Sequence, residues 1–158
     1  MPVVDASVAF KWFSAEDGSE QASALLATTE LLVAPDLIVA EVCNATWKAV
    51  RAGIMRNEQQ DHAASRLAAA FDALVPAAPL APRAVEISRT LDHPVYDCIY
   101  LALAEARDTF LVTADRRLLE RVKRTEWERR VTDLRTVSET PKRLLDSRSG
   151  GQRDPDRP

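Results

Sequence analysis

The sequence HPVYDCIYLALAEA, residues 93–106, decides the fold of this chain. Read as a helix, the stretch from Val95 to Ala104 is apolar on almost every side, which is typical of a helix inside a hydrophobic core. Asp97 nevertheless lies in its first turn, and a lone buried carboxylate costs on the order of several kcal/mol without a cation or hydrogen-bond donors. Two interpretations compete: Asp97 serves the free N–H groups and the dipole of the helix N-terminus, or it binds a metal ion together with other carboxylates.

The length and composition predict a single globular domain. The chain has 158 residues, of which 46% are hydrophobic and 28% charged, and this is enough to bury a sizeable core. No apolar run approaches the ~20 residues of a membrane span. Asp5 and Lys11 interrupt the short apolar N-terminus, so we expect no signal peptide and a cytoplasmic location. Cys43 and Cys98 lie in apolar helical patterns and are expected to be reduced packing residues.

Charge is unevenly distributed along the chain. Residues 1–115 carry a net charge of −8, whereas residues 116–158 carry +5. An acidic body with a basic C-terminal third suits a metal-binding site beside a surface that contacts a polyanion, although solvated arginines would produce the same pattern.

The apolar segments and the turn residues between them predict alternating strands and helices. We expect strands at residues 2–5, 31–34, 75–80, 110–113 and 131–134. We expect helices at residues 7–13, 19–29, 37–52, 56–74, 82–91, 95–107 and 116–123. Because helices separate the strands, the fold class is expected to be three-layer α/β/α with a central, mostly parallel sheet of four to five strands.

Two boundaries follow from local composition. Asp36 is expected to cap the helix that begins at residue 37. Residues 1–140 are expected to form the domain, and residues 146–158 a disordered tail, because SRSGGQRDPDRP contains no apolar anchor.

Four acids fall where this fold would bring them together. Asp5 and Asp115 each follow a predicted strand, and the carboxyl ends of parallel strands meet at one edge of a sheet. Asp97 opens the helix before the second of these strands, and Glu41 lies on the apolar stripe of the helix after strand two. Each also has an ordinary interpretation, as a helix cap for the three aspartates and as a partly exposed ion pair for Glu41.

Four carboxylates in one cleft could not all ionise without a cation. An oxygen-only set of ligands favours Mg²⁺ or Mn²⁺, and the chain has too few Cys and His residues for a thiolate or imidazole zinc site. Such an ion activates its bound water and neutralises a scissile phosphate, so that no protein nucleophile is needed. His62 and His93 are interpreted as a surface residue and a loop residue without a catalytic role.

Four short motifs together resemble the PIN-domain ribonucleases, and more narrowly the toxin subunits of VapBC toxin–antitoxin systems. They are VVDAS at 3–7, AEVxN at 40–44, HPVYDxxYLALA at 93–104 and LVTADRRL at 111–118. None is specific alone, but all four occur in order over residues 2–134. The charged WERR connector and the C-terminal tail match nothing in the family pattern.

The resemblance implies an endoribonuclease that depends on Mg²⁺ or Mn²⁺ and leaves a 5′-phosphate and a 3′-hydroxyl. It implies that Asp5, Glu41, Asp97 and Asp115 are the catalytic and metal-binding acids, although Asp115 has an alternative structural role at its helix start. It also implies a homodimer, neutralised by a small antitoxin whose C-terminal segment covers the acidic cleft.

Five further residues are candidates for supporting roles. Ser7 and Thr113 are expected to support the metal site through their hydroxyls, and Asn44 to hold a metal-bound water or Glu41. Arg116 and Arg117 are candidates for contacts with RNA phosphates, with simple surface solvation as the alternative.

Three rival functions remain open at the sequence level. A haloacid-dehalogenase-like phosphatase needs a second acid two residues after Asp5, where Ser7 stands. A degenerate PIN module that only binds a partner is disfavoured by the four retained acids. A PIN nuclease that processes RNA without an antitoxin is distinguished by whether a small protein co-purifies with the chain.

Overall fold

The computed structural model describes residues 1–28 and 31–139. Within them the sheet has five strands in the order β3-β2-β1-β4-β5, and every neighbouring pair is parallel. The strands are β1 (Val3–Val4), β2 (Val33–Pro35), β3 (Ala73–Val75), β4 (Leu111–Thr113) and β5 (Val131–Asp133). The expected fold class is thus confirmed, at the upper limit of the predicted number of strands.

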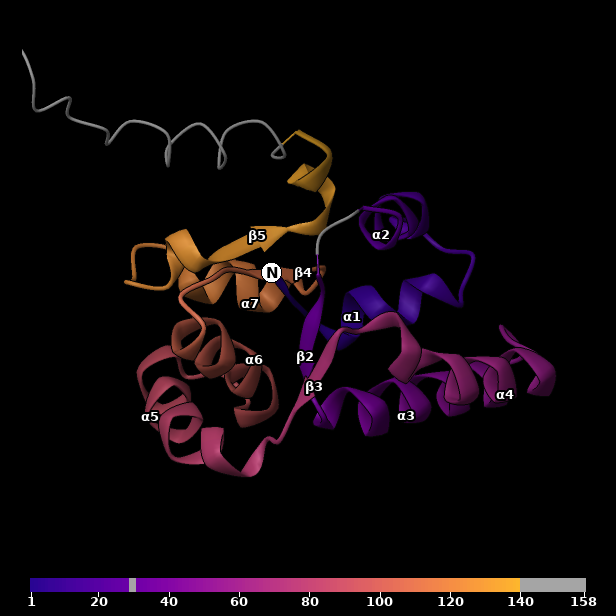
Figure 1. Ribbon diagram of the computed structural model, residues 1–158, viewed down its shortest axis with the longest axis horizontal. Coiled ribbons are helices and arrows are strands. Elements are labelled where there is room, and N and C mark those ends of the chain that lie inside the picture. Colours follow the sequence, from indigo (N-terminus) through magenta and orange to yellow (C-terminus); the bar gives the residue numbers. More distant parts are fainter. Residues whose placement is uncertain (29–30, 140–158) are drawn as a thin grey trace, which may run out of the picture.

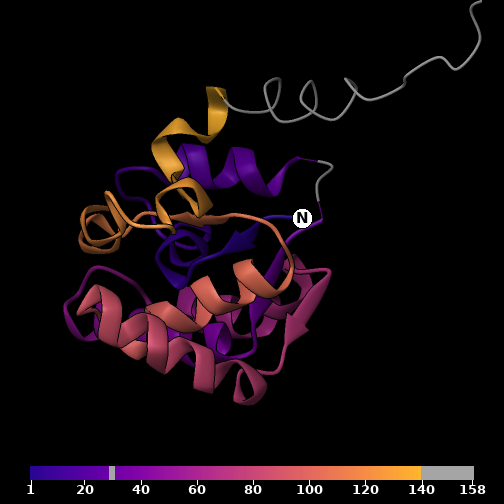
Figure 2. The same cartoon turned by 90° about the vertical axis from the view of Figure 1, so that its left-hand side faces the viewer.

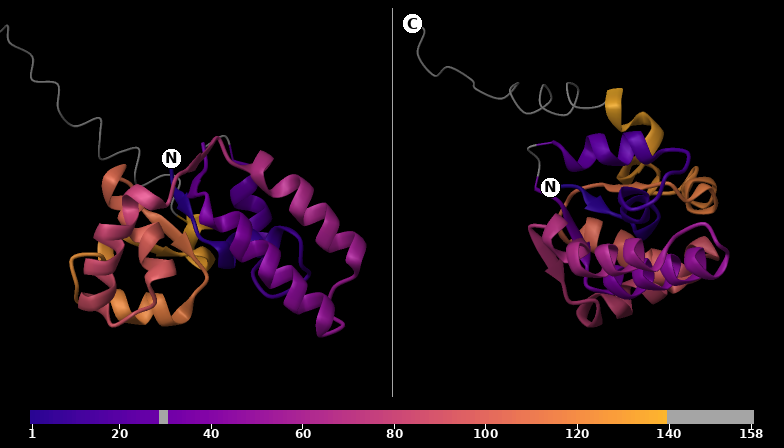
Figure 3. Two further views of the ribbon diagram at one scale, coloured as in Figure 1. Left: turned by 90° about the horizontal axis from the view of Figure 1, so that it is seen from below. Right: turned by 90° about the vertical axis from the view of Figure 1, so that its right-hand side faces the viewer.

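Helices connect the strands and cover both faces of the sheet (Figures 1 and 2). The α-helices are α1 (Ala6–Ala9), α2 (Ser19–Leu26), α3 (Leu37–Arg51), α4 (Asn57–Arg66), α5 (Ala81–Leu91), α6 (Val95–Ala106) and α7 (Arg116–Val122). The 3₁₀ segments are Phe10–Trp12, Leu67–Ala70, Ala78–Leu80, Glu128–Arg130 and Leu134–Glu139. Helices α5 and α6 lie on one face, and α2 with the last 3₁₀ segment lies on the other (Figure 2). Helices α3 and α4 form a pair that extends away from the sheet (Figure 3).

Helix α6 is the centre of the hydrophobic core. Every residue from Cys98 to Ala104 is buried, and the helix packs against β1, β2 and β4. This burial explains the nearly uninterrupted apolar sequence of its body. Its N-terminal turn carries Asp97.

The strand order creates a crevice at one defined place. The chain runs outward from β1 through β2 to β3, and then crosses back to place β4 on the other side of β1. The carboxyl ends of β1 and β4 therefore flank the topological switch point, where open α/β sheets bind their ligands. Asp5 directly follows β1, and Asp115 lies two residues beyond the end of β4.

The structure corrects three local expectations. The strand expected at residues 75–80 lies at Ala73–Val75, and Ala78–Leu80 forms a 3₁₀ segment, since prolines in this stretch have no N–H for a strand ladder. The helix expected over residues 56–74 ends at Arg66, continues as a 3₁₀ segment, and gives way to strand β3 at Ala73. Asp36 makes no side-chain cap on α3; its Oδ1 instead accepts a hydrogen bond from the Ala77 N–H at 3.0 Å, which joins β2 to the chain after β3.

The predictions for the two cysteines and for His62 are confirmed. Cys43 and Cys98 are free thiols, as predicted, and His62 is exposed on α4. Among the residues described, no helix has the length and apolar character needed to cross a bilayer. The tail expected at residues 146–158 lies outside the described residues.

Candidate active site

A cavity of about 420 Å³ lies at the carboxyl edge of the sheet, and all four predicted acids line it. They arrive from four different elements: Asp5 from the end of β1, Glu41 from α3, Asp97 from α6 and Asp115 from the start of α7. Residues separated by more than 100 positions in the sequence therefore meet in one site, as the parallel-sheet argument predicted.

Asp5 is the most deeply buried of the four acids, with 4% of its surface exposed. The register between β1 and β4 pairs Val4 with Val112, so that the next residue on each strand places Asp5 beside Thr113. The Thr113 hydroxyl donates a hydrogen bond to Asp5 Oδ2, and the Ser7 hydroxyl donates another at 2.8 Å. Burial raises the pKa of Asp5, and these hydroxyls oppose that shift.

Glu41 is held by a residue that the sequence patterns did not single out. The Tyr100 hydroxyl donates a hydrogen bond to Glu41 Oε2 at 2.5 Å, although Tyr100 is otherwise enclosed in the core. Burial raises the pKa of Glu41 to about 7, and the negative charges of Asp5 and Asp97 also raise it. The hydrogen bond from Tyr100 acts in the opposite direction and lowers this pKa. A carboxyl group with such a pKa is only partly ionised at neutral pH.

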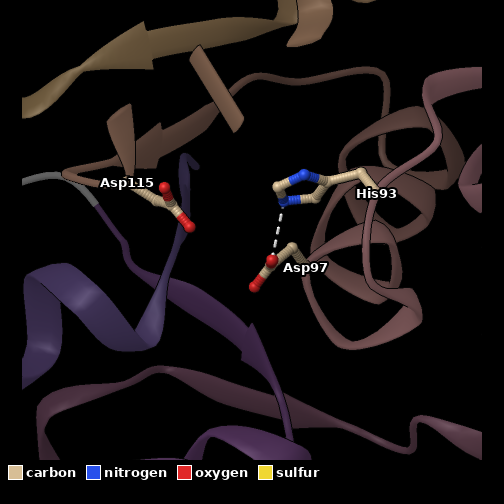
Figure 4. A group of neighbouring side chains, drawn as sticks. All are labelled: His93, Asp97 and Asp115. Atoms are coloured by element: carbon tan, nitrogen blue, oxygen red, sulfur yellow. Dashed lines mark ion pairs between the residues drawn. The ribbon is translucent and has the colours of Figure 1, made fainter. Parts of the chain in front are cut away.

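Asp97 faces both the cavity and a buried histidine. His93 Nε2 lies 2.7 Å from Asp97 Oδ2, and Asp115 approaches from the opposite side (Figure 4). Burial raises the pKa of Asp97 to about 6; the charge of Asp5 adds to this shift, and His93 opposes it. His93 lies in a loop, as expected, and one potential ligand atom from each of His93, Asp97 and Asp115 lies within 4.8 Å of the others.

Asp115 caps helix α7 and also lines the cavity. Its Oδ1 accepts hydrogen bonds from the N–H groups of Arg117 at 2.7 Å and Leu118 at 3.4 Å, which makes it the N-cap of α7. Its own N–H donates to Thr113 Oγ1 at 3.0 Å. Thr113 therefore links Asp5 to Asp115, and the capped carboxylate still lines the cavity.

The remaining candidates occupy different positions around the site. Ser7 and Asn44 line the cavity, and Thr113 lies behind Asp5. Arg116 is exposed and lines a neighbouring cavity of about 240 Å³, which shares Lys11 with the first. Arg117 is exposed and lines neither cavity; only its backbone contacts Asp115.

The carboxylates of this site fit a divalent cation. The pKa values of Asp5, Glu41 and Asp97 are all raised, so ionising them together in the protein alone is unfavourable. In each of the four acids, the side-chain contacts and the cap described above fall on a single carboxylate oxygen. Carboxylate oxygens of this kind are the ligands that hard cations such as Mg²⁺ or Mn²⁺ bind.

Sequence reasoning missed several residues that surround these acids. Tyr100 lies three residues after Asp97 on the same side of α6, and His93 lies four residues before Asp97 in the loop that leads into this helix. Lys48 lines the cavity and lies seven residues after Glu41, which is two helical turns on the same face. Lys11 lines it as well and pairs with Glu16 at 2.5 Å.

Comparison with known proteins agrees with this arrangement. The family model described as PIN domain matches residues 3–125. The chain is 34% identical over 121 residues to "Ribonuclease VapC3" from Pyrobaculum aerophilum, a match that covers 75% of this chain and 92% of that protein. A crystal structure of PAE2754, also from Pyrobaculum aerophilum, shares the fold with a TM-score of 0.63 at 24% identity, and covers 85% of this chain and 90% of that one. The chain therefore belongs to the PIN-domain family.

Proposed function

We propose that this chain is a Mg²⁺- or Mn²⁺-dependent endoribonuclease and the toxin subunit of a toxin–antitoxin pair. The observation that carries the proposal is the meeting of Asp5, Glu41, Asp97 and Asp115 in one cavity at the switch point of the sheet. The similarity to a protein named as a VapC ribonuclease supports the same activity.

The four acids would bind the ion, and neighbouring hydroxyl groups would orient the carboxylates of two of them. A bound divalent ion supplies an activated water and neutralises charge on the scissile phosphate. Asp5 would be the fixed ligand, because Ser7 and Thr113 orient its carboxylate within the core. Tyr100 fixes Glu41 in the same way from α6.

RNA would approach the cavity from the side of α7. Arg116 and Arg117 are exposed at the start of this helix, directly after Asp115, and guanidinium groups bind phosphates well. Arg116 has the stronger position, because it lines the cavity adjacent to the four acids.

The proposed partners follow from the resemblance to VapBC toxins. A small antitoxin would cover the acidic cavity with its C-terminal segment, and the toxin would act as a homodimer in the cytoplasm. Co-expression with a small protein encoded beside this chain tests this part: a stable complex in which RNA cleavage is lost supports it, and a chain that cleaves RNA equally with and without that protein contradicts it.

Purified protein tests the nuclease proposal itself. We expect RNA cleavage that requires Mg²⁺ or Mn²⁺, stops in EDTA and is lost in Asp97→Asn. Asp61→Asn is the matched control, because Asp61 is an exposed acid on α4 outside the cavity. Full cleavage by a folded Asp97→Asn protein, or cleavage that persists without divalent ions, would contradict the proposal.

A further inference from the structure

His93 is a buried polar side chain that faces the carboxylate of Asp97. Only 4% of its side chain is exposed, and no hydrogen bond reaches its Nε2 from any residue that the structure describes. This nitrogen lies 2.7 Å from Asp97 Oδ2, and the two groups form an ion pair when the imidazole is protonated. A buried nitrogen in this state requires compensation from a proton or a cation.

The backbone holds His93 in this position from both neighbouring helices. Asp92 ends α5 in the left-handed conformation with φ of 48°, which turns the chain sharply toward α6. The His93 N–H donates to the Ser88 carbonyl at 3.2 Å, and the Ser88 hydroxyl donates back to the His93 carbonyl at 2.6 Å. These hydrogen bonds hold the loop from which the imidazole points at Asp97 (Figure 4).

Two carboxylates share the space in front of this nitrogen. One ligand atom from each of His93, Asp97 and Asp115 lies within 4.8 Å of the others. The three side chains come from the α5–α6 loop, from α6 and from the start of α7 (Figures 1 and 4). An imidazole nitrogen and two carboxylates, arranged around one point, form a donor set that transition-metal ions bind.

We propose that His93 is a nitrogen ligand of the active-site metal, and that His93, Asp97 and Asp115 together make this site selective for first-row transition-metal ions such as Mn²⁺ over Mg²⁺. The imidazole is an additional ligand beside the four acids. A nitrogen ligand favours transition-metal ions, because Mg²⁺ strongly prefers oxygen ligands. This inference rests on the proposed nuclease function for the use of the metal, but metal binding itself is measured without RNA.

The alternative role for His93 is to position the carboxylate of Asp97 without binding the metal. An imidazole that donates a proton to Asp97 would orient the carboxylate, and the metal would then contact oxygen atoms only. The two roles predict different spectra and different metal selectivity, so one set of measurements separates them.

The first measurement is the electron spin echo spectrum of the protein loaded with Mn²⁺. An imidazole bound directly to Mn²⁺ gives nitrogen modulation in this spectrum. If the protein is made with histidine that carries the heavier nitrogen isotope, the modulation pattern must change. The chain has two histidines, so His62→Asn is the matched control and should keep the signal. Absence of nitrogen modulation in the Mn²⁺-loaded wild type would overturn the proposal, and this experiment needs no substitution that could impair folding.

The second measurement is the affinity of His93→Gln for each ion by calorimetry. We expect Mn²⁺ affinity to fall on the order of tenfold or more, as for other changes around metal sites, and Mg²⁺ affinity to change much less. Equal losses for both ions, or nitrogen modulation that survives in His93→Gln, would contradict ligation by His93. If the wild type shows nitrogen modulation but never cleaves RNA, the nuclease proposal fails and the metal site stands.

Discussion

The Tyr100 hydroxyl donates a hydrogen bond to Glu41 at 2.5 Å, and so connects the buried body of α6 to the carboxylate that α3 brings into the cavity. The same helix carries Asp97 one turn earlier. Movement of α6 would therefore displace two of the four acids together. The core helix is thus a rigid mount for the site, which is how precise functional geometry is maintained.

Tyr100→Phe should weaken metal binding at neutral pH while preserving the fold. The hydrogen bond from Tyr100 lowers the pKa of Glu41, so its loss should raise that pKa above about 7 and let protons compete with the cation. We expect apparent Mg²⁺ affinity at pH 7 to fall severalfold and to recover as the pH rises. The stability loss should be ~1 kcal/mol.

Tyr96→Phe provides the matched control for that experiment. Tyr96 lies in the same helix but is 62% exposed, so the same chemical change should leave Mg²⁺ affinity unaltered. Calorimetric titrations at two pH values measure both variants. Identical behaviour of the two would show that the bond between Tyr100 and Glu41 has no role in the site.

Glu41 should make the metal-free protein less stable as the pH rises. Its pKa in the folded protein is about 7, above the ordinary value of 4.5, so the folded state holds this proton more tightly than the unfolded state does. The stability from the protonated form is fully present below pH 4.5 and is lost as the pH rises through about 7. Over this pH range the free energy of unfolding of the wild type should fall by on the order of 1 kcal/mol relative to that of Glu41→Gln. The loss is this small because solvent screens the half-buried carboxylate.

Thermal melts in EDTA across this pH range measure the difference between the two proteins. In saturating Mg²⁺ at pH 7 the wild type should instead be more stable than Glu41→Gln. The cation binds only the folded protein, and it binds the wild type better. A difference that is constant with pH would show that Glu41 has an ordinary pKa.

Thr113→Val should damage the site through Asp5. The substitution keeps the volume of a fully buried side chain, but removes the hydroxyl that donates to Asp5 and accepts from the Asp115 N–H. We expect Mg²⁺ affinity to fall on the order of tenfold, and the free energy of unfolding by ~1–3 kcal/mol. Thr113→Ser retains the hydroxyl and should keep most of the affinity; if it binds Mg²⁺ as poorly as the valine variant, the effect comes from packing.

Arg116→Ala should weaken RNA binding without altering metal affinity. Each phosphate contact contributes about one unit to the slope of log affinity against log salt, so the slope should fall by ~1. Binding is best measured in the Asp97→Asn background, which we expect to be inactive. Arg107→Ala is the control, because Arg107 is the C-cap of α6 and lies ten residues after Asp97, ~15 Å along the helix axis.

The sequence predicts much of the fold because its signals are local. Short apolar runs that end in an acid, separated by helical patterns, allow few arrangements besides a parallel sheet with its acids on one edge. Asp5 and Asp115 follow directly from that topology, and Asp97 and Glu41 are conspicuous as acids on apolar helical faces. The structure brings all four into one cavity.

Most of the features that the sequence did not predict depend on contacts between residues far apart in the sequence. Residues 67–75 have a helical composition, but pairing with β2 makes the end of this segment a strand. Asp36 contacts Ala77 instead of capping its own helix. His93 and Tyr100 resemble loop and core residues, and only the folded structure shows that His93 contacts Asp97 and that Tyr100 contacts Glu41.

The central claim is that the four acids form a nuclease site, and mapping of RNA 5′ ends in a bacterial host tests it most directly. Expression of the wild type should create new RNA 5′ ends that carry phosphate and should slow growth, whereas Asp97→Asn at the same protein level should do neither. New 5′ ends at the same positions and frequency with a folded Asp97→Asn protein would contradict the account.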